Sequence, residues 1–277
     1  MKHKICIDVD AGFGLKMRDE IPVLAEIGFD GCFTTWQVGS DIPKTARLIA
    51  DCGLIYQSIH SPFRGIDVVW DEGKAGDDFI KMLVDCVRDC ASGNVPIAVV
   101  HPIIGMDKHT PTQLGIERFG RLLDEAQKCG VTVAFENVEG FEYLELIKRE
   151  LGTHSALGYC WDTGHEMCYN FSMDVPAVYG DRLVCTHLDD NMGMTDPNEM
   201  TWHDDSHLMP FDGVADWQGI ADRLNRVNYS APLTFELTRN SKPNRDTHRI
   251  YAHLDYEGFM RLAFEKAKKF AAMVESK

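Results

Sequence analysis

The stretch IAVVHPIIGMDKHTPTQLGIERFGRLLDEAQKCGVTVAFEN (97–137) contains two short apolar runs separated by one long segment of mixed polarity. The runs IAVVH (97–101) and VTVAFEN (131–137) are rich in β-branched residues, which is typical of buried strands. Between them, TQLGIERFGRLLDEAQKCG (112–130) has the pattern of a helix, and Gly130 stands where helices commonly end. The stretch therefore predicts a strand, a crossover helix and a second, parallel strand.

The same alternation of strand and helix continues along the whole chain. The eight predicted strands are KICIDV (4–9), GCFTT (31–35), LIYQSIH (54–60), IAVVH (97–101), VTVAFEN (131–137), ALGYCWD (156–162), LVCTHLD (183–189) and PLTFEL (232–237). Further helices are predicted over 17–29, 77–91 and 253–275. Eight such units favour an α/β fold of the closed (β/α)₈ TIM-barrel type. No composition shift marks a boundary, so we expect residues 1–277 to form a single barrel domain.

An open, doubly wound sheet is the alternative fold. Such sheets often bind dinucleotides through a G-x-G-x-x-G motif that follows a strand. The nearest stretch here is DAGFG (10–14), in which the spacing of the glycines is wrong. The barrel is therefore the preferred prediction.

Charge and composition restrict the partners and the compartment. The chain has 28 Lys and Arg residues against 43 Asp and Glu, a formal net charge of −15, which disfavours nucleic acids and anionic membranes as partners. Its nine cysteines are scattered without a C-x-x-C pair, as expected in a reducing cytoplasm. No run approaches the roughly 20 apolar residues of a membrane span. We expect a cytoplasmic protein, with homo-oligomer formation left open.

Six of the eight predicted strands end on a side chain that can bind a metal. These residues are His60, His101, Glu136, Asp162, His187 and Glu236. All parallel strands of a barrel end at one face, so the six side chains should converge there. Several buried charges together are costly without a cation between them. The sequence therefore predicts a divalent-metal site, with zinc and manganese as the leading ions and cobalt, iron or magnesium as alternatives.

The sequences around these residues resemble the xylose isomerase-like barrels, which include sugar and sugar-phosphate isomerases and epimerases and also endonuclease IV. In the ketose 3-epimerases of this family four strands supply the ligands of one metal. The matching positions are Glu136 in FEN, Asp162 in WDTGH, His187 in THLDDN and Glu236 in FEL. The resemblance also implies substrate contacts by Glu142 in ENVEGFE and His165 in DTGH. The epimerases carry an Arg where this chain has Gly193, so their sugar specificity does not transfer.

Other residues resemble ligands of the three-metal site of endonuclease IV. They are His60 in IHSPF, His101 in VVHP, His165 in DTGH, and Asp205 and His207 in DDSHL. One to three metals thus remain open, because sugar-modifying relatives with fewer metals use such histidines to bind substrate hydroxyls. An abasic-site nuclease is the rival function, and charge argues against it. The segment 61–80, for example, contains two basic residues and five acidic ones: Arg64 and Lys74 against Asp67, Asp71, Glu72, Asp77 and Asp78.

Three further features bear on the substrate. The loop TRNSKPNRDTHR (238–249) is basic and follows the last strand, where barrels often bind phosphate, although a solvated loop is the simpler interpretation. Trp36 and Trp202 lie in loops that could give a sugar pocket aromatic walls, and Trp36 is the predicted substrate contact. The irregular segment 190–216 follows the seventh strand, where it could close over a bound substrate.

Together these features predict a metal-dependent isomerase or epimerase that acts on a sugar, a sugar phosphate or a polyol. In this hypothesis Glu136 and Glu236 are the catalytic pair that moves a proton next to a carbonyl group through an enediolate. A metal-dependent dehydratase of a keto-sugar or keto-inositol is the alternative, with His207 or His165 as the acid. A sugar-binding protein without enzymatic activity is the third hypothesis, and it would not need the metal ligands.

Overall fold

The computed structural model describes residues 3–106, 110–171 and 173–274 of the chain. Within them, eight strands form one sheet in the order β7-β6-β5-β4-β3-β2-β1-β8. The strands are β1 (Ile5–Asp8), β2 (Gly31–Thr35), β3 (Ile55–His60), β4 (Ile97–Val100), β5 (Thr132–Glu136), β6 (Leu157–Asp162), β7 (Leu183–His187) and β8 (Leu233–Phe235). Their ladders are parallel, which confirms the (β/α)₈ barrel prediction.

The sheet closes between β7 and β8 without a regular ladder. An isolated parallel bridge pairs Leu188 with Phe235. Around it, the Leu188 N–H donates to the Thr234 carbonyl at 2.9 Å, and the Thr234 N–H donates to Oγ1 of Thr186 at 3.0 Å. A few hydrogen bonds therefore close the barrel at this seam.

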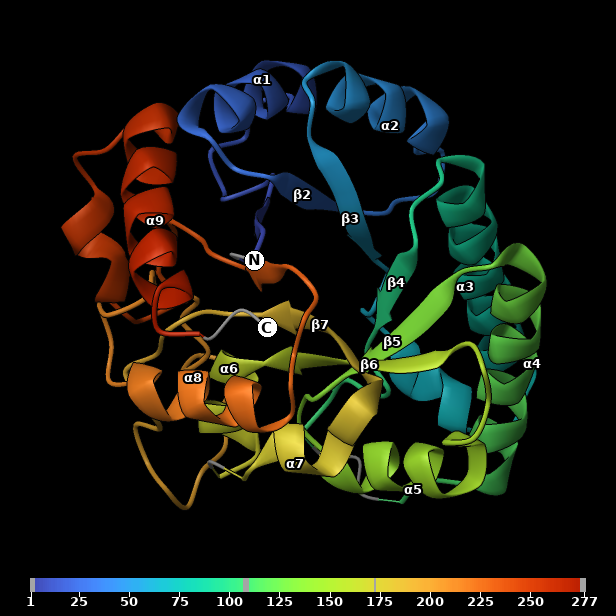
Figure 1. The fold of residues 1–277 in the computed structure, drawn as a ribbon. Coiled ribbons are helices and arrows are strands. Elements are labelled where there is room, and N and C mark those ends of the chain that lie inside the picture. The colour runs from blue at the N-terminus through green and yellow to red at the C-terminus, as the bar shows by residue number, and fades with distance from the viewer. Residues whose placement is uncertain (1–2, 107–109, 172, 275–277) are drawn as a thin grey trace.

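Helices surround the strands on the outside of the barrel (Figure 1). They are α1 (Met17–Ile27), α2 (Ile42–Asp51), α3 (Lys74–Ser92), α4 (Gln113–Cys129), α5 (Phe141–Leu151), α6 (Thr163–Tyr169), α7 (Val175–Tyr179), α8 (Trp217–Arg226) and α9 (Tyr256–Ala271). Three short 3₁₀ helices are η1 (Ile66–Trp70), η2 (Gly180–Arg182) and η3 (Thr247–Tyr251). No helix in the described ranges is both long enough and apolar enough to cross a bilayer.

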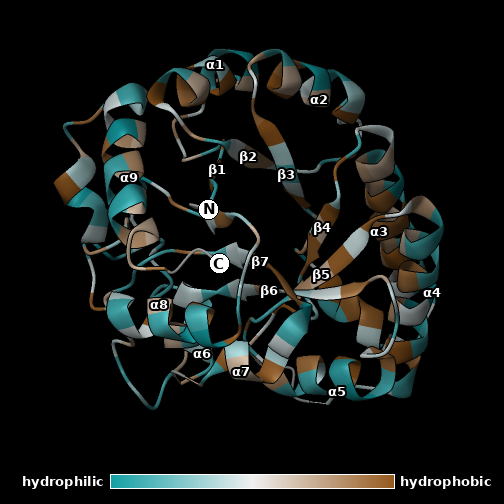
Figure 2. Ribbon diagram, in the orientation of Figure 1, coloured by the Kyte–Doolittle hydropathy of each residue, from teal (hydrophilic) through white to brown (hydrophobic). Residues whose placement is uncertain are grey.

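Helix α4 shows how local sequence sets these elements. The Thr112 side chain accepts a hydrogen bond from the Gly115 N–H, and Gly130 ends the helix in the left-handed region with φ 67°. The buried face of α4 packs on the sheet, where the rings of Phe119 and Phe135 meet edge to face with centroids 5.2 Å apart. Figure 2 shows the same division, with β3, β4 and β5 mainly hydrophobic and the helices of mixed polarity.

The inside of the barrel is filled just below the strand ends. Val99, Ala134, Cys160 and Cys185 form a small buried cluster there. Side chains alternate along a strand, so the residue two positions after each of these points inward one layer higher. Those residues are His101, Glu136, Asp162 and His187. The packed cluster is thus the floor on which the candidate site stands.

Candidate metal centre

The four residues predicted to bind metal lie together at the carboxyl ends of β5 to β8. Glu136, Asp162 and His187 are the last residues of their strands, and Glu236 follows β8 directly. One ligand atom from each of the four lies within 4.8 Å of the others. The strand register explains part of this arrangement, because Asp162 is paired with His187 across β6 and β7.

Glu136 is fully buried and surrounded by imidazoles. His187 Nδ1 is 2.5 Å from its Oε1, while His101 Nε2 and His60 Nε2 are 2.8 Å and 3.3 Å from its Oε2. Burial alone would raise the pKa of Glu136, but His187, His101 and His60 outweigh burial and hold the pKa well below its usual value. Glu136 is therefore an anion at the centre of a histidine cluster.

Burial and neighbouring charges also shift the pKa values of Asp162, His187 and Glu236 in opposite directions. Burial raises the pKa of Asp162 to about 7, although His165 nearby lowers it. Burial disfavours the cationic form of His187, yet Glu136 and Glu236 hold its pKa well above the usual value. Burial also disfavours ionised Glu236, but His187 and His207 bring its pKa down to about 2. In the metal-free protein, a protonated His187 thus offsets part of the negative charge of Glu136 and Glu236.

A second group, formed by His165, Asp205 and His207, adjoins the first. His207 Nε2 is 2.9 Å from Asp205 Oδ2, and His165 Nε2 is 3.6 Å from the same oxygen. The spacing in DTGH has a structural cause, because Asp162 Oδ1 caps helix α6 by accepting from the His165 N–H at 2.6 Å. Burial lowers the pKa of both histidines, but the neighbouring carboxylates, Asp162 and Asp205 beside His165 and Asp205 beside His207, raise both above the usual value.

Several buried carboxylate oxygens at this centre lack a hydrogen-bond partner among the described residues. They are Oδ2 of Asp162, Oδ1 of Asp205 and both oxygens of Asp189. Unpaired buried oxygens of this kind are costly unless a cation compensates them. Carboxylates mixed with imidazoles form a donor set that suits zinc, manganese, cobalt or iron. The residues present therefore fit a divalent transition metal.

A cavity of about 550 Å³ opens above the centre. Its wall includes His60, His101, His165, His207 and Glu236 together with the aromatic side chains of Phe63, Tyr169 and Trp202. Trp202 belongs to segment 190–216, which contains no helix or regular strand among its residues, as predicted. The loop after β8 contacts this segment through Arg245. Its side chain pairs with Asp204 at 2.8 Å and donates a hydrogen bond to Thr195 at 3.1 Å, and both partners belong to segment 190–216.

Two predicted substrate contacts are not among the described residues that line this cavity. The Trp36 indole donates to Asp89 Oδ2 on α3 at 2.7 Å and lines a separate groove against that helix. Glu142 lies in the first turn of α5, whereas Glu139 from the preceding loop lines the large cavity. The substrate roles of Trp36 and Glu142 stay predictions, while Trp202 and Glu139 line the cavity.

Sequence reasoning also missed Asp8, the last residue of β1. Asp8 is buried, and burial followed by the charge of Glu236 raises its pKa well above the usual value. It ends an apolar run as the six predicted residues do, but the strand was predicted to continue to Val9. The same rule, applied with the observed strand boundary, finds it.

With the fold and the site described, the chain is assigned to a family: it belongs to the xylose isomerase-like TIM barrels, whose family model matches residues 21–255. An uncharacterised protein, y4fM, of Sinorhizobium fredii is 26% identical over 260 residues, which cover 79% of this chain and 80% of the relative. The family of the chain is thus known, while the curated relative carries no described activity.

Solved structures with the same fold include sugar epimerases. A D-psicose 3-epimerase with D-tagatose from Clostridium cellulolyticum H10 has a TM-score of 0.74 and 14% identity, covering 98% of this chain and 99% of the other. A 3-keto-D-glucoside 4-epimerase from E. coli has a TM-score of 0.69 and 15% identity, with coverages of 97% and 100%. A xylose isomerase-like TIM barrel/4-hydroxyphenylpyruvate dioxygenase fusion protein has a TM-score of 0.70 and 18% identity; the match covers 97% of this chain but only 45% of the fusion protein.

Proposed function

We propose that the protein is a metal-dependent isomerase or epimerase of a keto-sugar or related polyol. The observation that carries this proposal is the convergence of Glu136, Asp162, His187 and Glu236 beneath a cavity of about 550 Å³. A cavity of this size suits a small carbohydrate, and its aromatic walls suit the apolar C–H faces of a sugar. The sugar epimerases among proteins of the same fold are consistent with that substrate class.

The proposed chemistry is proton transfer next to a carbonyl group. A divalent cation held by the four residues would stabilise negative charge on the substrate's oxygen atoms. Glu236 lines the cavity with its side chain 21% exposed, so it can take a proton from substrate bound there. Glu136 lies deeper, beneath His60 and His101, and is proposed to serve the opposite face. His165 and His207 line the cavity and can donate hydrogen bonds to substrate hydroxyls.

A dehydratase is the second candidate, and one observation favours it. His165 and His207 line the cavity and pair with Asp205, whose charge favours the protonated form of both imidazoles. A protonated imidazole can give its proton to a departing hydroxyl group. Both candidates begin with removal of the same carbon-bound proton, so the products distinguish them.

Hydrogen exchange in heavy water tests the proposal. Metal-loaded protein is incubated with a panel of ketoses, keto-glucosides, keto-inositols and sugar phosphates, and deuterium incorporation is followed by NMR. We expect deuterium at the carbon next to the carbonyl group of at least one compound. Glu236→Gln should reduce this exchange by roughly 10²- to 10⁴-fold, because it removes the general base.

Metal analysis accompanies the exchange assay, so that loss of the ion is not mistaken for loss of the base. Near-normal exchange of both epimers of a substrate by metal-loaded Glu236→Gln would exclude Glu236 as the base, because Glu136 alone is expected to exchange only the epimer whose proton faces it. An exchanged product of unchanged mass, apart from deuterium, indicates an isomerase or epimerase, whereas loss of one water molecule indicates the dehydratase. Absence of exchange with every compound in the panel would contradict both candidates.

A further inference from the structure

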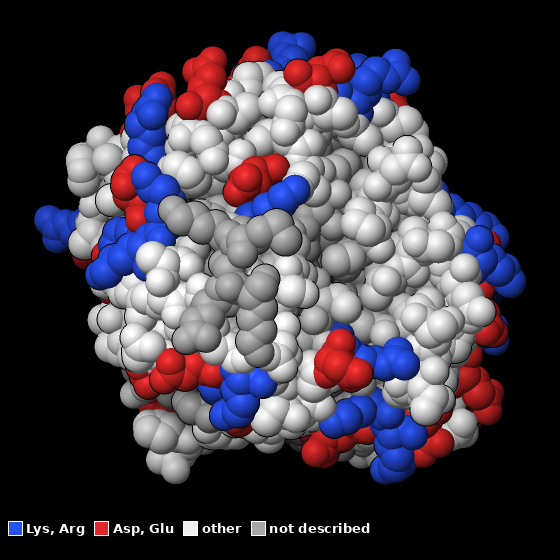
Figure 3. All heavy atoms as spheres, in the orientation of Figure 1, with Lys and Arg blue, Asp and Glu red and all other residues white. Residues whose placement is uncertain are grey.

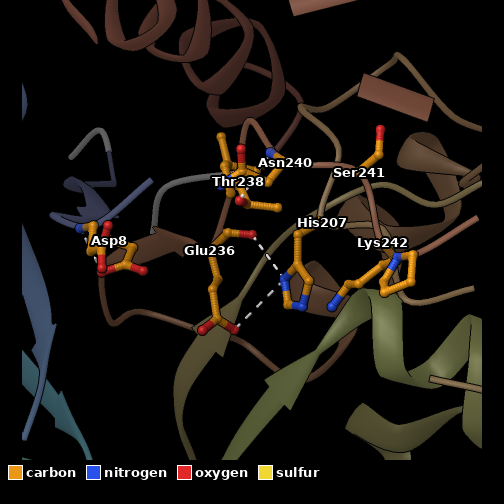
Figure 4. Close-up of a pocket in the computed structure, with 10 residues that line it drawn as sticks. Asp8, His207, Glu236, Thr238, Asn240, Ser241 and Lys242 are labelled. Atoms are coloured by element: carbon orange, nitrogen blue, oxygen red, sulfur yellow. Dashed lines mark hydrogen bonds and ion pairs between the residues drawn. The ribbon is translucent and has the colours of Figure 1, made fainter. Parts of the chain in front are cut away.

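A second, smaller cavity of about 290 Å³ lies beside Glu236, between the ends of β1 and β8. Asp8 and Asp10 line it together with residues that follow β8, and Figure 4 shows Asp8 across from those residues. Glu236, His207 and Lys242 line both this cavity and the larger one. A molecule that reacts beside Glu236 therefore meets both spaces.

The walls of the two cavities differ in chemistry. The larger cavity carries aromatic rings, which pack on apolar C–H groups. The smaller one is lined by Thr238, Asn240 and Ser241, whose hydroxyl and amide groups both donate and accept hydrogen bonds. Figure 4 shows these three side chains on the β8 side, with Asp8 across from them. This wall is suited to hydroxyl groups.

The Asp8 carboxyl group can accept more hydrogen bonds than the described part of the chain donates to it. Its side chain is only 8% exposed, and its Oδ1 accepts from the Asp10 N–H at 3.1 Å. Within the described part of the chain nothing else donates a hydrogen bond to this carboxyl group. A carboxyl group so buried ordinarily has several donors around it. Two neighbouring hydroxyl groups of a ligand would supply them.

The charges around this cavity do not suit a phosphate group. Among the described residues that line it, Lys242 is the only lysine or arginine, and its Nζ is 3.4 Å from Asp205 Oδ2. The three arginines of the loop after β8 are also engaged: Arg245 pairs with Asp204, Arg249 is 3.8 Å from Asp246, and Arg239 lies over the Phe13 ring at 4.4 Å. A dianion placed here would face several carboxylates and no cation that is not already paired.

We propose that the small cavity binds the neutral, hydroxylated end of the substrate, that Asp8 accepts hydrogen bonds from its hydroxyl groups, and that this contact selects against phosphorylated substrates. The proposal rests on the proposed function, and it makes Asp8 a specificity-determining residue. It also assigns the basic loop 238–249 the role of holding neighbouring acids in place.

Binding to the metal-loaded protein tests the proposal independently of turnover. The probes are D-fructose, D-tagatose, D-psicose and L-sorbose, and the 6-phosphates of the first two, titrated by calorimetry. At least one neutral ketose should bind, and its phosphate ester should bind at least about 10-fold more weakly. Asp8→Asn should weaken binding of the neutral ketose by about 10-fold, because the hydroxyl groups of the ketose lose hydrogen bonds to the Asp8 carboxyl group. It should also reduce the difference in affinity between the ketose and its phosphate ester.

Matched variants keep the test decisive. Asp124→Asn removes an exposed acid on α4 and should bind all probes as the unmodified protein does. If Asp8→Asn does not fold, as judged by its thermal unfolding, Thr238→Val on the opposite wall takes its place and should also weaken the neutral ketose. An ester that binds as tightly as its parent, an unchanged affinity in the cavity variants, or a panel without any binder would overturn the proposal.

Exchange measured on the same samples separates the two proposals. Hydrogen exchange that is indifferent to Asp8→Asn would overturn the cavity assignment and leave the proposed function standing. Binding that depends on Asp8 without any hydrogen exchange would overturn the proposed function and leave the cavity assignment standing.

Discussion

His187 lies between two carboxylates, with its Nδ1 2.5 Å from Glu136 and 3.2 Å from Glu236. Burial lowers the pKa of His187, but the two glutamates outweigh burial and raise it well above the usual value. The metal-free protein therefore holds a proton on this imidazole at neutral pH. A bond to metal needs a free nitrogen lone pair, so the proton must leave when the ion binds.

This competition predicts that metal affinity rises with pH between about pH 6 and pH 8 and that binding releases protons. The sign follows from the raised pKa, since below it the proton occupies the position that the metal needs. Calorimetric titration of metal-free protein with zinc, in two buffers of different ionisation enthalpy, measures the released protons. Affinity that is flat over this range, with no proton release, would remove His187 from the ligand set.

At the same scale, the sequence predicted which side chains lie close together where the signal is local. A His, Asp or Glu that ends an apolar run could be found without a structure, and the strand ends bring Glu136, Asp162 and His187 together. Trp36 could not be judged in this way, because its indole turns to Asp89, a partner distant in the sequence. Glu139 was missed because its place on the cavity wall depends on the path of the loop before α5.

At the scale of elements, helix α4 packs against η1 through a glycine. A Cβ atom added to Gly115 would lie 2.0 Å from Cε3 of Trp70, whose indole is fixed by donation to the Pro102 carbonyl at 2.7 Å. Gly120, on the same helix, has only Leu151 near it, at 3.8 Å. The two glycines thus provide a matched pair of substitutions.

We expect Gly115→Ala to lower the free energy of unfolding by roughly 1 to 3 kcal/mol, because the methyl group overpacks against Trp70. Gly120→Ala should instead raise it by up to about 1 kcal/mol, since alanine favours the helix and meets no close neighbour. Urea unfolding of both variants measures the difference. Equal changes in the free energy of unfolding of the two variants would show that η1 moves to accommodate the methyl group and that the Trp70 indole is not fixed.

The sequence predicted the strands better than the helices. All eight strands begin and end within two residues of their predicted bounds, because their apolar runs are short and strong. Helix α2 was not predicted, although Asp41 caps it and Pro43 stands in its first turn. Helix α7 spans only Val175–Tyr179, which is too short for a periodic pattern to be visible.

At the scale of the whole molecule, charge bears on the rival nuclease function. The residues that resemble ligands of endonuclease IV lie in neighbouring clusters, so the ligand set alone does not separate a nuclease from a sugar enzyme. The net charge of −15 favours the sugar enzyme, because an acidic protein repels the phosphates of DNA. Figure 3 shows the face at the amino ends of the strands, opposite the candidate metal centre, and on it the described Lys and Arg side chains lie among Asp and Glu and form no continuous basic track.

We therefore predict no incision of an abasic-site duplex at physiological salt, even with zinc added, because the protein cannot neutralise enough phosphates to bind DNA. Gel analysis of a labelled duplex after incubation with metal-loaded protein measures this, with a known abasic-site nuclease as the positive control. Efficient incision would make the nuclease the leading function and leave the sugar proposal without support.

The closure of the barrel has a consequence for the role of the ion itself. Strands β7 and β8 meet through an isolated bridge, and His187 and Glu236 stand on the two sides of that join. An ion bonded to both residues would cross-link β7 and β8 at the seam where no regular ladder of backbone hydrogen bonds joins the strands. Binding of the ion would then complete the metal site and stabilise the closed barrel in one step. Protein without the ion would lack this cross-link between β7 and β8.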